Sequence, residues 1–600
     1  MANTLLDLFE KNHQLLEWRD KISLLSRQLV MGFSGSSKAV VMASALSEQV
    51  PKILIVTSTQ NEAEQLTGDL SAILGEDKVY SFFADDVSAA EFIFASPEKT
   101  HSRLESLNFL IDKETSGILV TSLVGTKLHL PNPEVYKDSR IDLTLGEEHD
   151  LEALSKHLTH IGYQRVEQVL SPGEFSRRGD ILDIYELTAE LPYRLEFFGD
   201  EIDGIRQFDS DSQKSLNNLD HVAISPADDI ILTREDYQRA EKALESAVSK
   251  AEGPHNAYLE EVLSVTIDGY RHKDLRKFLS LFYDKAYTLF DYLPKGTPVF
   301  VDDFQKIVDR HGRLELEVAN LLTEDLHQGK SLSYLNYFVD SFKTLRNYQP
   351  ASFFSNFHKG LGNLKFDKLY QFTQYPMQEF FNQFPLLVDE IHRYTKNKAT
   401  VILQVGSEKQ LKSLKETLEE YDLDLPLSRF GDLIPYKPQL VLGNLSNGFY
   451  FADEKLVLVT EREIFHKKVK RRARASHVSN AERLKDYNEL EKGDYVVHQT
   501  HGIGQFKGIE TIEIKGVHRD YLTIQYQDAA TISLPVEQIE SLSKYVSADG
   551  KEPKINKLND GRFQKTKQKV SKQVEDIADD LLKLYAERSQ LKGFAFSPDD

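Results

Sequence analysis

The chain has no cysteine among its 600 residues, and it has one tryptophan and four methionines. The absence of cysteine excludes disulfides, thiolate metal ligands and a cysteine nucleophile. No apolar run is long enough to cross a bilayer. The first residues mix acidic and apolar side chains instead of forming a signal peptide. We therefore expect a cytoplasmic protein that has no contact with a membrane.

Positive charge is also scarce. The 73 lysines and arginines are outnumbered by 94 aspartates and glutamates, which gives a formal net charge of −21. Because such a surface repels phosphates, we expect only weak or local contact with double-stranded DNA, and we expect protein partners first. Residues 466–476 are the exception, with six basic residues within eight. This stretch is either a solvated linker or a tether for nucleic acid or an acidic partner.

Apolar and aromatic side chains are plentiful, at 40% and 10%, which is enough for several folded domains. Short apolar runs at 52–57 and 118–121 alternate with helical patterns, which predicts a parallel sheet with crossover helices. Paired strand-like runs between 181 and 208 predict a small α+β domain inserted into this larger one. A strand at 298–303 then resumes the large domain, and a second α/β unit is expected to begin near Phe353.

The last part of the chain has a different pattern. Short alternating strands between 493 and 545, interrupted by glycines, predict a small β-barrel. Apolar residues at helical spacing between 570 and 591 predict a long helix that needs a partner to pack on. The fold class is therefore multi-domain α/β with one small barrel. The expected domains are an α/β domain at 1–137, its inserted α+β domain at 138–226, its second part at 227–350, a small α/β domain of unknown role at 351–465, a basic linker at 466–486, the barrel at 487–548, and a linker with the long helix at 549–600.

The stretch from Gly32 to Ala39 looks like a phosphate-binding loop that lacks essential groups. The P-loop pattern G-x-x-x-x-G-K-[ST] requires a second glycine and a hydroxyl group that binds Mg²⁺. Gly32 and Lys38 fit this pattern, but Ser37 stands in place of the glycine and Ala39 in place of the hydroxyl residue. We therefore expect this loop to be non-functional as a nucleotide site.

Other candidate sites are also incomplete. The partner carboxylate of an ATPase site would be Asp302 at a strand end, but Asp303 stands where an activating glutamate is usual. Gly329 begins a G-K-[ST] triplet that no apolar strand precedes, so we expect a loop there. His498 and His501 have the spacing of a metal-binding pair without a third ligand beside them. We expect no catalytic residue, no metal and no cofactor in this chain.

A group of charged and aromatic residues in the insertion is more informative. Arg194, Glu196 and Phe198 share one face of a predicted strand by period two, and Arg178 comes from the start of the neighbouring strand. This composition is typical of a protein–protein hot spot. The alternative is an internal salt bridge over a core phenylalanine, and composition alone does not separate the two.

At these residues the sequence resembles a known family. PGEFSRRGDILDIY at 172–185 and YRLEFFGDEIDGIRQFD at 193–209 resemble the UvrA-binding domain shared by UvrB and the transcription-repair coupling factors. The stretches at 496–516 and 520–545 resemble the RNA polymerase-interacting module of the same factors, which is related to the SH3/CarD-like barrel. The resemblance implies a first domain that looks like UvrB without its ATPase, which agrees with the degenerate loop.

The resemblance also assigns residues. It implies that Arg178, Arg194 and Phe198 contact UvrA, with Glu196 as their neighbour. It implies that Ile512 is the apolar residue that contacts the RNA polymerase β subunit, by addition of a strand to a sheet edge.

The implied function is that of an adaptor in transcription-coupled DNA repair, which docks on RNA polymerase stalled at a lesion and recruits nucleotide excision repair through UvrA. In this family an ATP-dependent DNA translocase follows the long helix, so we expect this chain to lack the motor and to need neither ATP nor Mg²⁺. Two alternatives remain. One is a stand-alone CarD-like regulator that binds RNA polymerase, and the other is a nucleotide hydrolase that uses Lys38 and Asp302.

Overall fold

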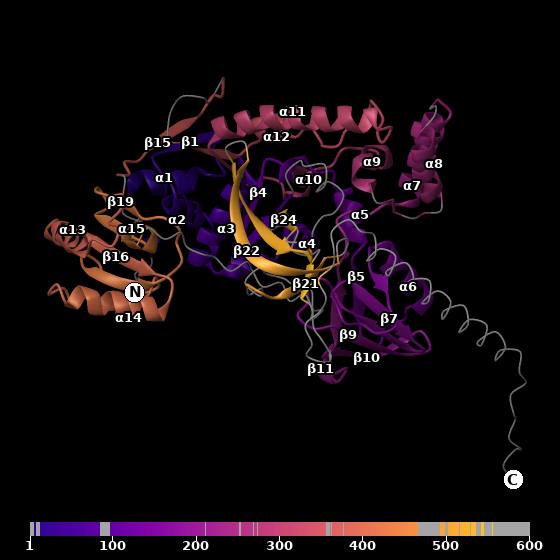
Figure 1. The fold of residues 1–600 in the computed structure, drawn as a ribbon, viewed down its shortest axis with the longest axis horizontal. Helices are drawn as coiled ribbons and strands as arrows, with labels where there is room; N and C mark the ends of the chain where they lie inside the picture. Colours follow the sequence, from indigo (N-terminus) through magenta and orange to yellow (C-terminus); the bar gives the residue numbers. More distant parts are fainter. Residues whose placement is uncertain are drawn as a thin grey trace, which may run out of the picture. The chain divides into compact units, whose positions relative to one another are not determined.

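The computed structural model describes residues 5–7 and 12–84, then 97–355 apart from 211, 251–253, 268, 270 and 273 (Figure 1). It also describes residue 361 and residues 363–465 apart from 376. Of the remaining residues it describes 492–498, 502–514, 517–527, 530–535, 542–544 and 555. The chain divides into two compact units, Met1–His477 and Val478–Asp600.

The first unit is built on a sheet of seven parallel strands. The strands are β1 (Arg27–Met31), β2 (Lys52–Thr57), β3 (Val79–Phe82), β4 (Gly117–Ser122), β13 (Val299–Asp302), β14 (Ala351–Ser355) and β15 (Lys368–Gln371). Their order across the sheet is β15-β1-β14-β13-β2-β4-β3. Every residue of β2 and β4 is buried, as is usual where helices cover both faces of a parallel sheet. The parallel sheet predicted from the apolar runs is confirmed.

Two apolar cores lie on the two faces of this sheet. Ile53 and Ile55 of β2 belong to one core, and Leu54 and Val56 belong to the other, because side chains alternate along a strand. Helices α1 (His13–Lys21), α2 (Ser36–Ser44) and α3 (Gln60–Leu74) contribute to the first core. Helices α4 (Pro97–Ile111), α5 (Pro133–Asp138), α10 (Leu289–Tyr292), α11 (Phe304–His327) and α12 (Phe342–Asn347) contribute to the second. The single tryptophan, Trp18, is fully buried in the first core.

The second α/β unit begins later in the chain than the sequence suggested. Strand β14 lies between β1 and β13 in the first sheet, and β15 lies at its edge, so the boundary expected at 351 is wrong. The pattern of a buried parallel strand does not reveal which strands are its neighbours, and those of β14 come from two distant parts of the chain.

A five-stranded sheet forms the second α/β unit. Its elements are α13 (Phe384–Lys396), β16 (Thr400–Val405), α14 (Glu408–Glu419), β17 (Leu427–Ser428), β18 (Pro438–Leu442), β19 (Phe449–Phe451), β20 (Leu456–Val459) and α15 (Glu461–Phe465). The strand order is β17-β18-β16-β20-β19. One face of this sheet joins the first core of the large sheet: the ring of Phe33 lies 4.5 Å from that of Phe372 and 5.5 Å from that of Phe451.

A small α+β unit lies between β4 and β13 in the chain. Strands β5 (Ile141–Thr144) and β12 (His221–Ile224) pair at its base. Between them lie α6 (Leu151–His160) and the strands β6 (Gln164–Arg165), β7 (Glu174–Arg178), β8 (Ile181–Ile184), β9 (Tyr193–Phe198), β10 (Glu201–Phe208) and β11 (Ser215–Leu219). These six strands form one sheet in the order β11-β10-β9-β8-β7-β6, and its inner face packs on α6 around Leu158, Leu182 and Leu195.

A helical region follows the insertion. It consists of α7 (Arg234–Val248), α8 (Pro254–Ile267) and α9 (Leu275–Phe282), which share an apolar core with the end of α11. Thr233 and Asp236 form a capping box that fixes the start of α7. Among the described residues, no helix is long and apolar enough to cross a membrane.

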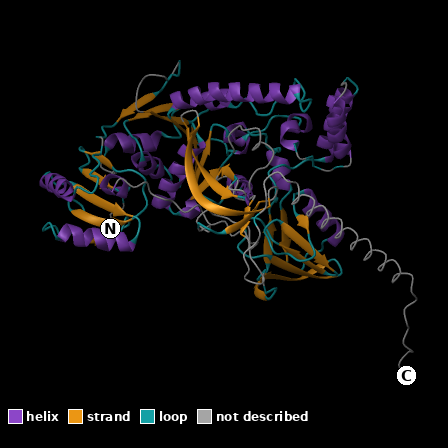
Figure 2. Ribbon diagram, viewed as in Figure 1, coloured by secondary structure: helices purple, strands orange, loops and turns teal. Residues whose placement is uncertain are grey.

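The second unit contains the predicted small β module (Figure 2). Its strands are β21 (Tyr495–His498), β22 (Gly502–Ile514), β23 (Val517–Gln525), β24 (Thr531–Pro535) and β25 (Leu542–Lys544), in the antiparallel order β24-β23-β22-β21-β25. Strand β22 has 13 residues and is longer than the short strands that the sequence suggested. The expected linker at 466–486 and the helix expected between 570 and 591 lie outside the described residues.

Candidate protein-interaction site

The outer face of the inserted sheet carries a row of charged side chains. Asp183 of β8 lies opposite Arg194 of β9, and Arg194 lies opposite Arg206 of β10. Glu196 and Phe198 continue the same face of β9 by period two. Leu195 and Phe197, the residues between them, point into the core. Arg178 does not start the strand next to β9, as expected, but ends β7, and β8 lies between the two. It shares the face because it lies opposite Ile181 of β8, which lies opposite Glu196.

Asp183 holds two of these arginines in place. Its side chain is fully buried, and it accepts hydrogen bonds from Arg194 Nε at 2.7 Å, from Arg194 Nη2 at 2.9 Å and from Arg178 Nη2 at 3.0 Å. Charge-assisted bonds of this kind offset the cost of burying a carboxylate. The hydrogen bonds that Arg194 donates to Asp183 raise the pKa of Arg194, so this arginine stays charged at every physiological pH.

Arg194 is anchored from two further directions. Its guanidinium lies 4.3 Å from the ring centre of Phe208, which is fully buried, and it donates to the backbone and side-chain oxygens of Gln213 at 3.2 Å. Only 14% of its side chain is exposed. Arg194 thus forms an internal salt bridge over a core phenylalanine, which was the alternative interpretation of this group of residues. It presents only one edge to a partner.

Phe198 and Arg178 are the accessible members of the row. Phe198 is 83% exposed at the end of β9, and the Arg178 side chain is 53% exposed. Glu196 accepts a salt bridge from Arg206 Nη2 at 3.1 Å, and both side chains are partly exposed. An exposed phenylalanine on the same face as pre-positioned arginines has the chemistry of an interface hot spot.

The degenerate phosphate loop brings Lys38 and Asp302 together. Lys38 Nζ lies 2.5 Å from Asp302 Oδ1, and both side chains are mostly buried. Gly32 has φ +95°, and a Cβ atom there would lie 1.9 Å from the carbonyl oxygen of Phe372. The lysine that would contact outer phosphates is therefore already neutralised by a carboxylate of the same chain. Among the described residues, no group of three or more His, Cys, Asp or Glu side chains is placed to hold a metal ion.

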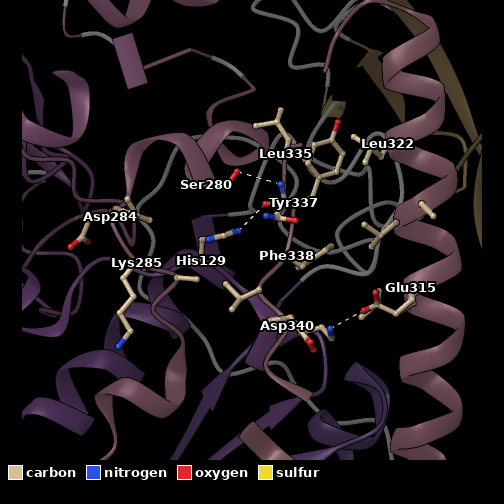
Figure 3. A pocket seen from close by; sticks show the side chains of 18 residues that line it. His129, Ser280, Asp284, Lys285, Glu315, Leu322, Leu335, Tyr337, Phe338 and Asp340 are labelled. Atoms are coloured by element: carbon tan, nitrogen blue, oxygen red, sulfur yellow. Dashed lines mark hydrogen bonds and ion pairs between the residues drawn. The ribbon is translucent and has the colours of Figure 1, made fainter. Parts of the chain in front are cut away.

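A cavity of about 530 Å³ lies in the first unit, between the end of α9, α11 and the segment 335–340 (Figure 3). His129 Nε2 is bonded to the Asn336 carbonyl oxygen at 2.8 Å, and Lys127 Nζ lies 3.0 Å from Glu315 Oε1. Burial lowers the pKa of His129, which keeps the imidazole neutral. These groups join the walls of the cavity to one another, and their arrangement gives no basis for a catalytic role.

Three family models match the chain. The UvrB interaction domain matches residues 141–229, the MFD D3 domain matches 394–464, and the CarD-like/TRCF RID domain matches 490–546. The transcription-repair-coupling factor of Bacillus subtilis strain 168 is 35% identical over 586 residues, which cover 96% of this chain and 50% of that protein. The factor of Staphylococcus haemolyticus strain JCSC1435 is 32% identical over 583 residues, which cover 95% of this chain and 49% of that protein.

The chain is a relative of the transcription-repair-coupling factors. It spans about half the length of the curated relatives it matches. The family resemblance inferred from the sequence is confirmed by these matches.

The matched ranges agree with modules of the structure. The UvrB interaction match begins at the first residue of β5 and ends shortly after β12, so it covers the whole insertion. The D3 match lies within the second α/β unit as the structure bounds it, and it does not include β14 or β15. The RID match covers β21 to β25.

In the module matched by the RID domain, Ile512 lies on β22 opposite Arg519 of β23. The described pairing joins β22 to β21 only at 502–505, whereas β23 pairs with β22 as far as Ile514. Ile512 is therefore on the part of β22 that has one described strand neighbour. Its side chain lies outside what the structure describes, and its role in binding stays a prediction.

Sequence reasoning missed three residues of the charged face. Asp183, Arg206 and Gln213 are each bonded to a predicted residue. The sequence pattern could have revealed Arg206, because Arg206 alternates with the apolar Ile205 on β10 as Arg194 alternates with Leu195 on β9. This alternation places both arginines on the outer face. No pattern pointed to Gln213, because it lies in a loop and its backbone is in the left-handed region at φ 59°.

Proposed function

We propose that this chain is the docking part of a transcription-repair-coupling factor. The insertion binds UvrA, the small β module binds the RNA polymerase β subunit, and together they bring nucleotide excision repair to polymerase stalled at a DNA lesion. Support comes from the matches to the UvrB interaction and CarD-like/TRCF RID domains and from relatives whose name is transcription-repair-coupling factor.

The observation that carries the UvrA part is the outer face of the insertion. Phe198 is 83% exposed where an internal role would bury it, and it lies on the same face of the sheet as two arginines held by a buried carboxylate. Burial of a phenylalanine against a partner stabilises a complex by about 2 kcal/mol or more. The arginines are positioned before binding, so little side-chain entropy is lost on contact.

The polymerase part rests on β22 of the second unit, which we propose to be an SH3/CarD-like barrel. Because the described pairing leaves one side of β22 without a strand beyond 505, an extended segment of the β subunit can add to the sheet there. Main-chain hydrogen bonds would give affinity, and Ile512 would set the register.

We propose no nucleotide hydrolysis by the residues of this chain. Lys38 is paired with Asp302, and Ala39 offers no hydroxyl for Mg²⁺. The ATP-dependent translocation of the family is proposed to belong to the half of the relatives that this chain does not match. A hydrolase at Lys38 would be favoured only by phosphate release that Lys38→Ala abolishes.

UvrA binding to the full chain, measured by calorimetry, tests the proposal. Phe198→Ala should weaken binding at least tenfold, because an exposed aromatic anchor is removed without loss of core packing. Leu316→Ala is the matched control, because Leu316 is 68% exposed on α11 outside the insertion, and it should bind as the unaltered chain does. Equal affinity of both variants for UvrA would refute the assignment of this face.

A further inference from the structure

Side chains of the chain itself occupy the degenerate phosphate loop. Gln374, which follows β15, accepts hydrogen bonds through Oε1 from the Ser34 amide at 3.0 Å and from Ser37 Oγ at 2.5 Å. Its Nε2 donates to Ser34 Oγ at 3.0 Å. A phosphate-binding loop uses its backbone amides to hold phosphate oxygens. Here the side-chain oxygen of Gln374 accepts the hydrogen bond of one of these amides, that of Ser34.

A second segment contacts the loop from the second α/β unit. It is the connection 444–448 between β18 and β19. Asp69 of α3 is 2% exposed, and it accepts hydrogen bonds from the Ser446 amide at 2.9 Å, from Ser446 Oγ at 2.8 Å and from Ser36 Oγ at 2.9 Å. Ser36 Oγ also accepts from the Asn447 amide at 2.9 Å. Asp69 and Ser36 thus join the first turn of α2 to the second α/β unit.

The space around the loop is filled as well. Gly35, the residue before α2, has φ +59°, and a Cβ atom there would lie 3.0 Å from Cβ of Asn447. Beneath these polar contacts Phe33 packs against Phe451 of the second α/β unit. The loop is closed by polar contacts at its rim and by a shared apolar core beneath.

We propose that the former phosphate loop now serves as the mount for the second α/β unit. Gln374 Oε1 takes the place of a phosphate oxygen at the Ser34 amide, and the segment 444–448 donates to Ser36 and Asp69 beside the loop, so the loop holds this unit on the large sheet and excludes nucleotide. The position of Asp69 beside the positive end of α2 favours its charge, and three donors satisfy its oxygens. This role is separate from the binding of UvrA or polymerase and gives the D3-matched region a structural task.

Hydrogen exchange of the full chain tests the mount. In Asp69→Ala, amides of both 444–448 and 32–38 should exchange at least tenfold faster, because the carboxylate that joins them is gone. Gln374→Ala is a milder second variant on a half-buried residue, and it should speed exchange at Ser34. Glu76→Ala, an exposed acid just after α3, is the control and should change neither segment.

The outcomes separate clearly. Faster exchange of both segments in Asp69→Ala with unchanged exchange in the insertion supports the mount. Unchanged exchange at 444–448 in that variant overturns it. A second result would also overturn it: the double variant Ser37→Gly/Ala39→Thr binds a fluorescent ATP analogue in the presence of Mg²⁺ while 444–448 stays protected from exchange. If 444–448 fills the loop, restoring the motif residues alone should not let nucleotide bind. UvrA affinity should be the same in all these variants, so failure of the mount is distinguishable from failure of the proposed docking function.

Discussion

Replacement of Asp183 by alanine is the sharpest perturbation of the charged face. The change removes three hydrogen bonds from guanidinium groups, two of them from Arg194 and one from Arg178. It also leaves the guanidinium of Arg194, whose side chain is only 14% exposed, without its counter-charge. The insertion should therefore lose stability, and both arginines should lose their fixed positions.

The magnitude follows from how exposed each partner is. Breaking a buried ion pair by removing one partner costs about 3 to 5 kcal/mol. Arg178 is 53% exposed, so solvent screens its pair, which contributes only about 0.5 kcal/mol. The main loss comes from Arg194, and we expect Asp183→Ala to lower the free energy of unfolding of the insertion by about 3 kcal/mol. Arg178→Ala should lower it by less than about 1 kcal/mol.

The assay must observe the insertion itself. Fluorescence of Trp18, the single tryptophan, reports on the core of the large sheet, where it lies against Phe300 and Phe354. Hydrogen exchange at the amides of β8 and β9 reports on the insertion, and a loss of about 3 kcal/mol corresponds to exchange faster by about a hundredfold. If Arg178→Ala destabilises these strands as much as Asp183→Ala does, the account centred on Asp183 is wrong.

Two further predictions concern other parts of the chain. Ile512→Asp should weaken polymerase binding more than tenfold, because an apolar-to-charged change at a small interface costs about 2 kcal/mol or more. A pull-down of RNA polymerase measures this loss, and unchanged UvrA binding is the control. Equal polymerase binding by the variant and the unaltered chain would refute the prediction. Burial lowers the pKa of His129 in the folded state below its ordinary value of about 6.5. Between the folded-state pKa and about pH 6.5, the folded state therefore binds fewer protons than the unfolded state. The stability contributed by neutral His129 is present above about pH 6.5 and is lost as the pH falls through the folded-state pKa. Thermal unfolding of the full chain at a series of pH values should show this fall, and His129→Gln should reduce it; an identical pH dependence in the variant would contradict the assignment.

Much of the local structure could be predicted from residue patterns. The apolar run Lys52–Thr57 became a strand as predicted, and so did the run at 118–121 and the run around Tyr193–Phe198. These segments carry their signal in consecutive residues, because burial on one or both faces of a strand dictates which positions are apolar. The face that carries Arg194, Glu196 and Phe198 was predictable for the same reason.

The partners of these elements were not predictable. Asp183 is one of many aspartates, and only the pairing of β8 with β9 sets it beside Arg194. Gln374 and Asp69 reach the phosphate loop from distant parts of the chain, and neither belongs to a motif. Which of the two interpretations of Arg194 holds depended on the place of Phe208, which only the folded sheet supplies.

The sequence by itself determined that the nucleotide loop lacks its second glycine and its hydroxyl residue, and that one strand face combines arginines with a phenylalanine. The tertiary structure alone decided that β14 completes the first sheet, that a carboxylate neutralises Lys38, and that the second α/β unit fills the loop. The physical reason is that local patterns record which positions are buried, whereas the contacts that satisfy a buried charge or an amide join residues far apart in the chain.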